Sequence, residues 1–266
     1  MKTYSATERY NFILEILHRQ GSASVMFLAE KLKVSPVTIR KDLTTLEEKK
    51  LLYRTHGSAI QINPYINDRH VQEKEKLYTE EKRQIGMEAA KLITPNDSIL
   101  IASGTTVHAF AREIRAQEHL TVITAALKVT NILAQQKEID IIQLGGFVRN
   151  SSLSVVGSYA EEMLSNFSCS KLFMGVDGID LNYGLTTTNV MEAQLNRAMM
   201  NASQKTIVLA DSSKFGRRGF GKICDLDNIE QIITDDKINP SILENLREKG
   251  IEVTIANSIE KTSAKL

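Results

Sequence analysis

The sequence is poor in cysteine and has no long apolar run. Its two cysteines, Cys169 and Cys224, are far apart and lack any CxxC or histidine-rich spacing, so neither a disulfide framework nor a zinc site is indicated. No apolar segment approaches the roughly 18 residues of a membrane-spanning helix, and residues 1–10 lack the apolar core of a signal peptide. We therefore expect a cytoplasmic protein without a metal or other cofactor.

The chain has the composition of a folded protein and an uneven distribution of charge. Of its 266 residues, 42% are hydrophobic and 24% are charged, which is typical of one or two globular domains. Residues 1–60 contain 10 lysines and arginines against 6 acidic residues, a net charge of +4, whereas the rest contains 23 against 26, a net charge of −3. Because basic side chains neutralise DNA phosphates, this suggests a polyanionic partner for the N-terminal part only, although a solvated surface can have the same imbalance.

The first sixty residues have the pattern of three helices. In residues 7–19, apolar side chains recur at spacings of three and four, which indicates an amphipathic helix that ends at Gly21. A second helix is predicted over 23–32. Ser35 and Pro36 predict the start of a third, because a serine oxygen caps free backbone N–H groups and proline fits the first turn.

The third helix has the surface expected of a DNA-recognition helix. Ile39, Leu43 and Leu46 are spaced to face the other two helices. The residues left on its outer face are Val37, Thr38, Arg40, Lys41, Thr44 and Thr45. Their hydroxyl and basic groups suit the bases and phosphates of a major groove.

Segment 51–60 predicts a wing, because it reads as two short β segments around a turn. Residues 1–60 are therefore predicted to form a winged helix-turn-helix that binds double-stranded operator DNA. The predicted contacts are Ser35, Thr38, Arg40, Lys41 and Arg54, the last of which contacts phosphate. A three-helix protein-interaction module has the same helix pattern and is the alternative.

The stretch VSPVTIRKDLTTLEEKKLLYRTHGSA, residues 34–59, resembles the N-terminal motif of the DeoR family of transcriptional regulators. That motif contains a serine, a TIR-basic-DL core, a Leu-Glu pair and an R-x-HGG-A wing. Lys41 stands where the family usually has arginine, and Ser58 where it usually has a second glycine. Lysine cannot make the two parallel hydrogen bonds that arginine makes to a base, so we expect Lys41 to alter base preference. We expect Ser58 to affect only the shape of the wing.

Residues 61–78 are predicted to link this domain to a second one. They are polar, contain Pro64 and show no sustained apolar stripe. Tyr65, Arg69 and His70 are candidates for an interdomain contact, although a solvated connector has the same composition.

Residues 79–258 are predicted to form a larger α/β domain with a mainly parallel sheet, because β-rich apolar runs alternate with helical patterns. The predicted strands are 98–102, 120–124, 139–144, 171–176, 205–210, 230–234 and 251–256. In such sheets ligands bind beyond the carboxyl ends of the strands, so the residues that follow each strand are candidates for a binding site.

Four of these strands are followed by residues suited to a phosphorylated sugar. The glycine turn and hydroxyls of 103–106 offer N–H groups to a phosphate, Lys214 adds positive charge, and carboxylates can accept hydrogen bonds from sugar hydroxyls. The predicted effector-binding residues are Ser103, Gly104, Thr105, Thr106, Gly145, Gly146, Arg149, Asp177, Asp180, Glu192 and Lys214. A helix cap or a common Asp-Gly turn explains some of these features singly, but their joint position favours a site.

The same part of the chain resembles the DeoR family in EKxxIxxxAA at 81–90, DSILIASGTT, LGGxxR, GVDGID, GLTTTN and LADSSKFG. The resemblance implies a sensor domain similar in fold to ribose-5-phosphate isomerase, with a phosphorylated sugar as its effector. It further implies a repressor of a carbohydrate-metabolism operon, and because helix-turn-helix proteins bind two half-sites, we expect a homo-oligomer. Asn196 stands where the family usually has a lysine before R-A-M, which concerns effector preference.

Similarity to an isomerase raises an enzyme as the alternative function. The isomerase uses a carboxylate base with a lysine beyond its DGxD turn, but this chain has no lysine between Lys171 and Lys205. Enediolate chemistry would therefore lack its usual cation. We predict binding without turnover, with a sugar-phosphate isomerase carrying a DNA-binding appendage as the alternative.

Overall fold

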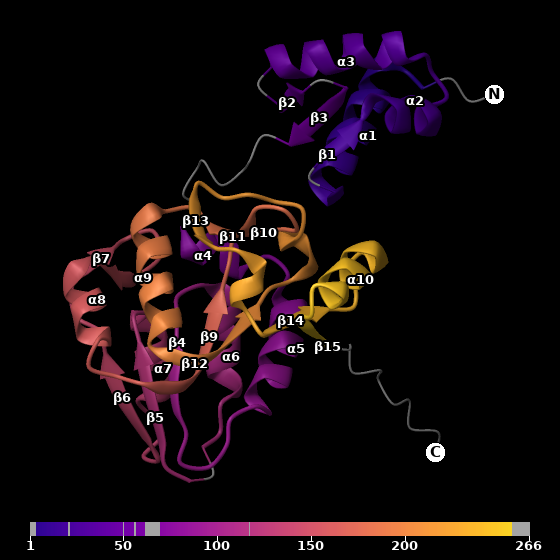
Figure 1. The fold of residues 1–266 in the computed structure, drawn as a ribbon. Helices are drawn as coiled ribbons and strands as arrows, with labels where there is room; N and C mark the ends of the chain where they lie inside the picture. The colour runs from indigo at the N-terminus through magenta and orange to yellow at the C-terminus, as the bar shows by residue number, and fades with distance from the viewer. Residues whose placement is uncertain are drawn as a thin grey trace, which may run out of the picture. The chain divides into compact units, whose positions relative to one another are not determined.

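The computed structural model describes residues 4–256, except 21, 50, 56, 62–69 and 117. It contains two compact units, one built mainly from the chain up to residue 64 and the other mainly from the residues that follow. They are called here the N-terminal unit and the C-terminal unit (Figure 1). Tyr65 and Arg69, two candidates for an interdomain contact, lie outside the described residues, as does His56 in the predicted wing.

The N-terminal unit consists of three helices and a small sheet. Its helices are α1 (Ala6–Gln20), α2 (Val25–Leu32) and α3 (Pro36–Glu48). The strands β1 (Ser22–Ser24), β2 (Leu52–Thr55) and β3 (Ser58–Gln61) pair antiparallel in the order β1-β3-β2. Ile39, Leu43 and Leu46 of α3 are buried against the other two helices, as predicted. The unit thus has the helix-turn-helix and the two-stranded wing that the sequence predicts.

The helix starts in this unit follow from capping serines. The pattern predicts a helix from residue 23, but α2 begins at Val25, because residues 22–24 pair with β3 and the Ser24 hydroxyl caps the helix by accepting from Phe27 N at 3.1 Å. The predicted start of α3 is confirmed. Its first residue is Pro36, and Ser35 Oγ accepts a hydrogen bond from Thr38 N at 3.2 Å.

A seven-stranded sheet forms the centre of the C-terminal unit (Figure 1). Its strands are β4 (Ser98–Ile101), β5 (Leu120–Thr124), β6 (Ile139–Gln143), β9 (Cys169–Gly175), β12 (Ser203–Leu209), β14 (Gln231–Asp235) and β15 (Glu252–Ala256). They lie in the order β15-β14-β12-β9-β4-β5-β6, and every neighbouring pair is parallel. The predicted α/β domain is confirmed, and each predicted strand belongs to this sheet.

The strand order reverses direction between β4 and β9. From β4 the chain continues to β5 and β6 on one side, whereas β9, β12, β14 and β15 extend to the other. The connections therefore leave the carboxyl ends of β4 and β9 in opposite directions, which opens a crevice where ligands bind in open α/β sheets.

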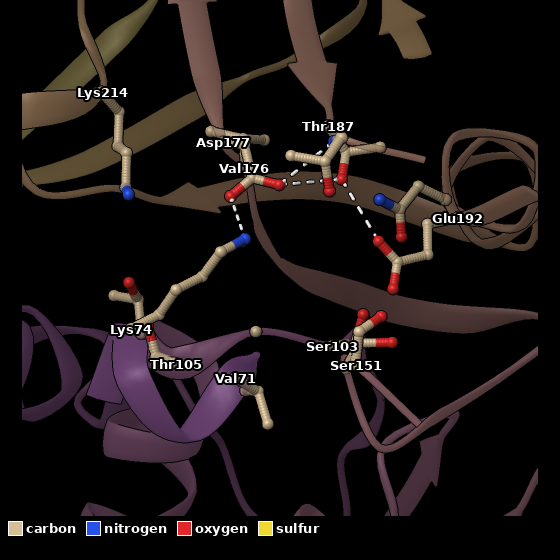
Figure 2. Close-up of a pocket in the computed structure, with 16 residues that line it drawn as sticks. Val71, Lys74, Ser103, Thr105, Ser151, Val176, Asp177, Thr187, Glu192 and Lys214 are labelled. Atoms are coloured by element: carbon tan, nitrogen blue, oxygen red, sulfur yellow. Dashed lines mark hydrogen bonds and ion pairs between the residues drawn. The ribbon is translucent and has the colours of Figure 1, made fainter. Parts of the chain in front are cut away.

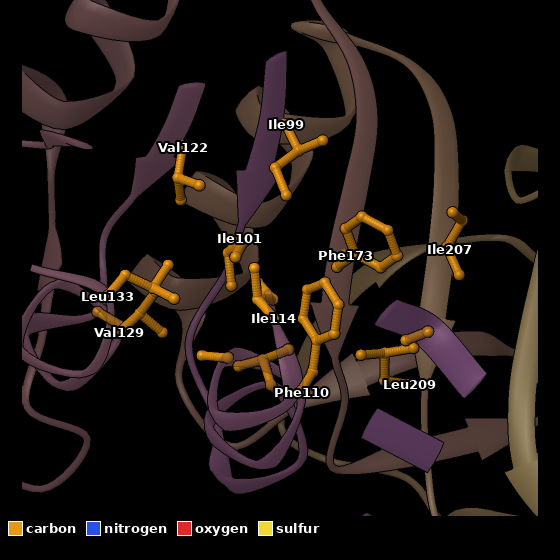
Figure 3. Close-up of a cluster of buried hydrophobic side chains, with 14 of the residues drawn as sticks. Ile99, Ile101, Phe110, Ile114, Val122, Val129, Leu133, Phe173, Ile207 and Leu209 are labelled. Atoms are coloured by element: carbon orange, nitrogen blue, oxygen red, sulfur yellow. The ribbon is translucent and has the colours of Figure 1, made fainter. Parts of the chain in front are cut away.

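Helices cover the sheet on both faces. The helices are α5 (Thr79–Ala90), α6 (Thr105–Glu113), α7 (Leu127–Leu133), α8 (Ser158–Leu164), α9 (Val190–Asn201) and α10 (Pro240–Glu248). Buried side chains of α5, α6 and α7 pack with sheet residues such as Phe173 in one apolar cluster, in which the rings of Phe110 and Phe173 lie 4.4 Å apart (Figure 3). Alternate strand residues such as Leu172 and Met174 are also buried, and α9 packs against β9 and β12.

Short elements complete the C-terminal unit. They are helix α4 (Val71–Glu75), the strands β7 (Phe147–Arg149), β8 (Ser154–Val156), β10 (Gly178–Asp180), β11 (Gly184–Thr187) and β13 (Gly221–Cys224), and two 3-10 turns, Ser212–Lys214 and Leu226–Asn228. Helix α4 falls within the span predicted as a linker. Val71 is buried, and its N–H donates to Ser151 O at 2.7 Å, so an ordered part of the C-terminal unit starts before residue 79.

Candidate DNA-binding surface and effector pocket

The outer face of α3 presents the predicted basic side chains. Arg40 and Lys41 are exposed, as is Ser35 at the helix start, whereas Thr38 is half-buried. The Thr38 and Ser35 hydroxyls lie 2.9 Å apart. Both hydroxyls therefore take part in the helix cap, whereas Arg40 and Lys41 present positive charge to solvent on this face.

Arg54 lies closer to α3 than the sequence suggests. Its guanidinium donates to Thr44 Oγ1 at 2.6 Å and lies 3.8 Å from Glu47 Oε2, while its backbone N–H donates to Glu47 Oε1 at 2.9 Å. The first strand of the wing is thus fastened to the recognition helix. A contact between Arg54 and DNA phosphate stays a prediction, and it would share the guanidinium with Thr44.

The inner face of α3 contains an ion pair that the sequence pattern did not reveal. Asp42 is buried among apolar residues, and its carboxylate accepts two hydrogen bonds from Arg9 of α1, at 2.6 and 2.8 Å. Removing one partner of such a buried pair leaves an uncompensated charge, which is strongly destabilising. The pair therefore fixes α3 against α1 and presents the outer face in one orientation.

A pocket lies at the crevice between β4 and β9, and its lining comes from loops, helices and strand ends that are far apart in the sequence (Figure 2). Seven of the predicted effector-binding residues line it: Ser103, Gly104, Thr105, Thr106, Asp177, Glu192 and Lys214. The lining residues outside that prediction are Val71, Lys74, Ser151, Ser152, Gly175, Val176, Thr187, Thr188 and Asn196. The reversal of strand order explains why these segments meet, because each follows or faces a strand end at this edge.

One wall of the pocket suits a phosphate. The chain turns at Gly104, whose φ of 126° and ψ of 162° are strained for any residue with a side chain, and α6 begins at the next residue. Thr105 and Thr106, the first two residues of this nine-residue helix, line the pocket, and the first turn of a helix has N–H groups without a partner inside the helix that suit an anion. Lys214 lies on the same pocket and adds a positive charge.

The opposite wall is acidic and centred on Asp177. Its carboxylate pairs with Lys74 Nζ at 2.8 Å and accepts hydrogen bonds from Thr187 Oγ1 at 3.1 Å and Thr188 N at 3.2 Å (Figure 2). Burial alone would raise the pKa of Asp177, but the positive charges of Lys74 and Lys214 and these hydrogen bonds hold it below its ordinary value. Asp177 is therefore an ionised hydrogen-bond acceptor.

Glu192 forms a second acidic position, supported by Arg149. Their side chains are both largely buried and pair at 2.6 Å between Arg149 Nη1 and Glu192 Oε1. Thr187 Oγ1 lies 3.3 Å from Glu192 Oε2, which links this carboxylate to Asp177. Arg149 itself does not line the pocket, but its ion pair holds the lining residue Glu192.

Three other predicted residues lie away from the pocket lining. Asp180 pairs with Arg218 at 2.8 Å and accepts hydrogen bonds from the N–H groups of Asn182 and Tyr183, which closes the turn between β10 and β11. Gly145 and Gly146 come just before the β7–β8 hairpin, outside the lining. Their predicted contact with an effector stays a prediction.

Lys74 and Asn196 are two of the pocket residues that the sequence-based prediction did not include. Asn196 is buried on α9 and lines the pocket at the position where the resemblance leads one to expect lysine. Lys74 belongs to a polar segment without apolar periodicity, so no pattern marks it. The GLTTTN motif did point to this wall, and its Thr187 and Thr188 are among the lining residues.

Comparison with known families identifies both units. Residues 9–64 match the DeoR-like helix-turn-helix domain, and residues 78–236 match the DeoR C-terminal sensor domain. The combination is that of a transcriptional regulator with a DNA-binding unit and a sensor unit. The chain belongs to the DeoR family, as its motifs predict.

Individual relatives agree with this assignment over almost the full length. The chain is 37% identical to the "Putative aga operon transcriptional repressor" of Escherichia coli O157:H7, covering 94% of this chain and 93% of that protein. It is 30% identical to the glycerol-3-phosphate regulon repressor of Haemophilus influenzae, covering 94% and 96%. Among solved structures, ribose 5-phosphate isomerase A from Methanocaldococcus jannaschii is similar at 17% identity and a TM-score of 0.37, over 50% of this chain and 53% of the isomerase.

The structure also bears on membrane association. Within its described residues, no helix combines the length and the apolar character needed to cross a bilayer.

Proposed function

We propose that this regulator represses a carbohydrate-metabolism operon and that a phosphorylated sugar releases it from its operator. The observation that carries the proposal is the pocket at the β4–β9 crevice, which is lined by a glycine turn and helix start and by the carboxylates of Asp177 and Glu192. The first wall offers N–H groups and Lys214 to a phosphate, and the second offers Asp177 and Glu192 to hydroxyls. The glycerol-3-phosphate regulon repressor among the relatives is named for a phosphorylated small molecule, which supports the same ligand class.

In this proposal the operator is bound by α3 and the wing. Arg40 and Lys41 supply exposed charge, and Ser35 and Thr38 lie at the end of the helix that enters the groove in helix-turn-helix proteins. Such proteins bind two half-sites as symmetric oligomers, so we propose a homo-oligomer. Sedimentation with and without a palindromic operator fragment measures this directly.

The proposal includes binding without turnover. A general base works best when its pKa lies near the operating pH, whereas the pKa of Asp177 is held below its ordinary value. Its carboxylate is also engaged by Lys74, Thr187 and Thr188 N–H. Steady product formation on incubation with pentose and hexose phosphates would instead establish the isomerase alternative.

The test is binding of the full chain to its own upstream DNA, followed by fluorescence anisotropy over a salt series and a panel of pentose and hexose phosphates. We expect specific binding that one member of the panel reverses. Arg40→Ala should weaken operator binding by roughly 1–3 kcal/mol if it contacts a base, and Lys49→Ala, at the far end of the same helix, is the matched control. Specific binding that no sugar phosphate alters would contradict the proposed effector, and equal Arg40→Ala losses on random DNA would make Arg40 a phosphate contact.

The pocket assignment has its own matched pair. Lys214→Met should weaken binding of the active sugar phosphate, because it removes a cation from the pocket, whereas Lys222→Met removes a half-buried lysine that pairs with Asp225 outside it. Equal affinities in the two variants, measured by calorimetry, would contradict a phosphate contact at Lys214.

A further inference from the structure

The lysine that reaches Asp177 does not come from the sheet or from the helices that cover it. Lys74 belongs to α4, which among the described residues is the first helix of the C-terminal unit, called here the sensor unit, after the connection from the N-terminal, DNA-binding unit. Its side chain and that of Asp177 are largely buried, at 20% and 13% exposed, and their charged atoms lie 2.8 Å apart. A carboxylate of the ligand pocket is thus bonded to the segment that leads to the DNA-binding unit (Figure 2).

Helix α4 has little stability of its own. It has five residues, and an isolated helix of that length does not form in water. Its position therefore depends on its contacts with the rest of the sensor unit. Loss of one of these contacts therefore lowers the stability of α4 in its observed position.

Helix α4 also has contacts with three neighbouring parts of the sensor unit. At its start, Val71 N donates to Ser151 O at 2.7 Å. Near its end, the buried Lys82 of α5 donates to the carbonyl oxygens of Lys74 at 2.7 Å and Leu77 at 2.6 Å. Glu75 pairs with Lys128 of α7 at 2.6 Å and contacts His108 of α6 at 2.9 Å. The Lys74–Asp177 pair differs from these contacts in that it joins α4 to a predicted ligand-binding side chain.

A ligand that hydrogen-bonds to Asp177 must compete with Lys74. A phosphorylated sugar brings both a hydroxyl that can bond to the carboxylate and a dianionic phosphate that attracts the ammonium group more strongly than a single carboxylate does. The ligand consequently favours an arrangement in which the pair is broken, and this differential interaction is what a ligand needs in order to shift a conformational equilibrium.

We propose that the Lys74–Asp177 ion pair holds α4 in the ligand-free, operator-binding arrangement, and that effector binding breaks it. Lys74 is then the residue that couples the pocket to the segment leading toward the DNA-binding unit. This inference rests on the proposed function in that operator affinity is its readout. It adds a residue and a mechanism that the motifs of the sensor domain do not contain.

The experiment is a double-mutant cycle in the absence of any ligand, with full-length Lys74→Met, Asp177→Asn and the double variant. We expect each single variant to bind the upstream operator roughly tenfold more weakly than the wild type, a typical size for allosteric coupling, and the double variant to bind no more weakly than the singles. Lys76→Met, which removes an exposed lysine from the end of the same helix, should bind like the wild type.

Two measurements separate loss of coupling from loss of structure. Lys74→Arg retains the charge and should restore most of the operator affinity, and hydrogen exchange of residues 71–76 should be faster in Asp177→Asn while the sheet stays protected. Operator binding that is unchanged in both single variants, or losses that add in the double variant, would overturn the proposal. Failure of the proposed effector is a separate observation: wild-type operator binding that no phosphorylated sugar reverses contradicts that function, while the ligand-free cycle still decides the role of the ion pair.

Discussion

Glu75 accepts contacts from cationic or imidazole groups on two helices. Lys128 Nζ lies 2.6 Å away, His108 Nδ1 2.9 Å and Arg112 Nη2 3.6 Å. The hydrogen bond from His108, together with Lys128, lowers the pKa of Glu75 to about 2 in spite of its partial burial. Burial lowers the pKa of His108, so this imidazole favours its neutral form even beside a carboxylate.

The Glu75 pKa predicts a loss of stability in acid. Because the folded-state pKa of Glu75 is lowered from 4.5 to about 2, its contribution to the free energy of unfolding is complete above pH 4.5 and is lost as the pH falls toward 2. This contribution is at most about 3 kcal/mol, because solvent screens this partly exposed carboxylate. We expect Glu75→Gln, which cannot titrate, to lose correspondingly less stability than the wild type between neutral pH and acid, as measured by urea unfolding.

The control for this prediction is Glu73→Gln, which removes an exposed carboxylate from the same helix. Its loss of stability in acid should match that of the wild type, since other carboxylates titrate in every variant. If Glu75→Gln lost as much stability as the wild type over the same pH range, the attribution to Glu75 would be wrong.

The pocket shows which site residues a sequence can predict. Asp177 and the 103–106 loop were predictable, because they directly follow strands whose carboxyl ends meet at one edge. Lys74 was not, since it pairs with a residue 103 positions later and lies in a segment without periodicity. Asp180 follows the same strand as Asp177, but it belongs to β10, and its carboxylate closes a turn instead of lining the pocket.

At the scale of elements, the start of α3 combines a structural and a proposed DNA-binding role. Ser35 caps the helix, and removing such a cap costs about 1 kcal/mol. We expect Ser35→Ala to lower the stability of the N-terminal unit by that amount. Ser35→Asp should keep the cap, yet weaken operator binding because its charge repels DNA phosphates.

These two variants separate the roles when stability and operator affinity are measured on the same samples by thermal unfolding and fluorescence anisotropy. Ser35→Asn, an equally good cap without charge, is the matched control. Operator affinity in Ser35→Asp equal to that of Ser35→Asn would remove Ser35 from the proposed DNA contacts.

The hairpin of β10 and β11 depends on Gly184, which contacts β13. Its φ of 96° is unfavourable for other residues, and an added Cβ would lie 2.1 Å from Cys224 O. We expect Gly184→Ala to destabilise the sensor unit by roughly 2–5 kcal/mol, from clash and backbone strain combined. Gly250→Ala has a similar φ of 81° with nothing within 4 Å, so it should cost only roughly 1–2 kcal/mol. Equal losses in urea unfolding would show that the clash relaxes.

The long and the short strands differ in how far the sequence predicts them. The seven strands of the main sheet are buried apolar runs, which stand out against the polar turns around them. The strands β1, β7, β8 and β10 have three residues each, too few to show an alternation of period two. They form because the tertiary fold brings their pairing partners together, and no local sequence pattern indicates that pairing.

At the scale of the whole molecule, the distribution of charge agrees with one DNA-binding unit and one sensor unit. The net charge of +4 lies in residues 1–60, within or beside the match to the helix-turn-helix domain, and the net charge of −3 lies in the remainder. Non-specific affinity for DNA should therefore come from the N-terminal unit, with a mildly acidic sensor unit that adds none. Regulation by an effector then requires that effector binding to the C-terminal unit be coupled to operator binding by the N-terminal unit.

This coupling predicts that the operator and the sugar phosphate weaken each other's binding to the same extent. If a phosphorylated sugar weakens operator binding by some factor, the operator must weaken binding of the sugar phosphate by the same factor, because both describe one coupling free energy. We expect factors in the range of roughly 5- to 150-fold, measured by calorimetric titration of the sugar phosphate into the free protein and into the operator complex. A scrambled duplex at the same concentration and salt is the control for non-specific charge effects.

If the operator left the affinity for the sugar phosphate unchanged while the sugar phosphate still displaced the operator, release could not proceed through a shared conformational equilibrium, and direct competition for the DNA-binding surface would have to explain it.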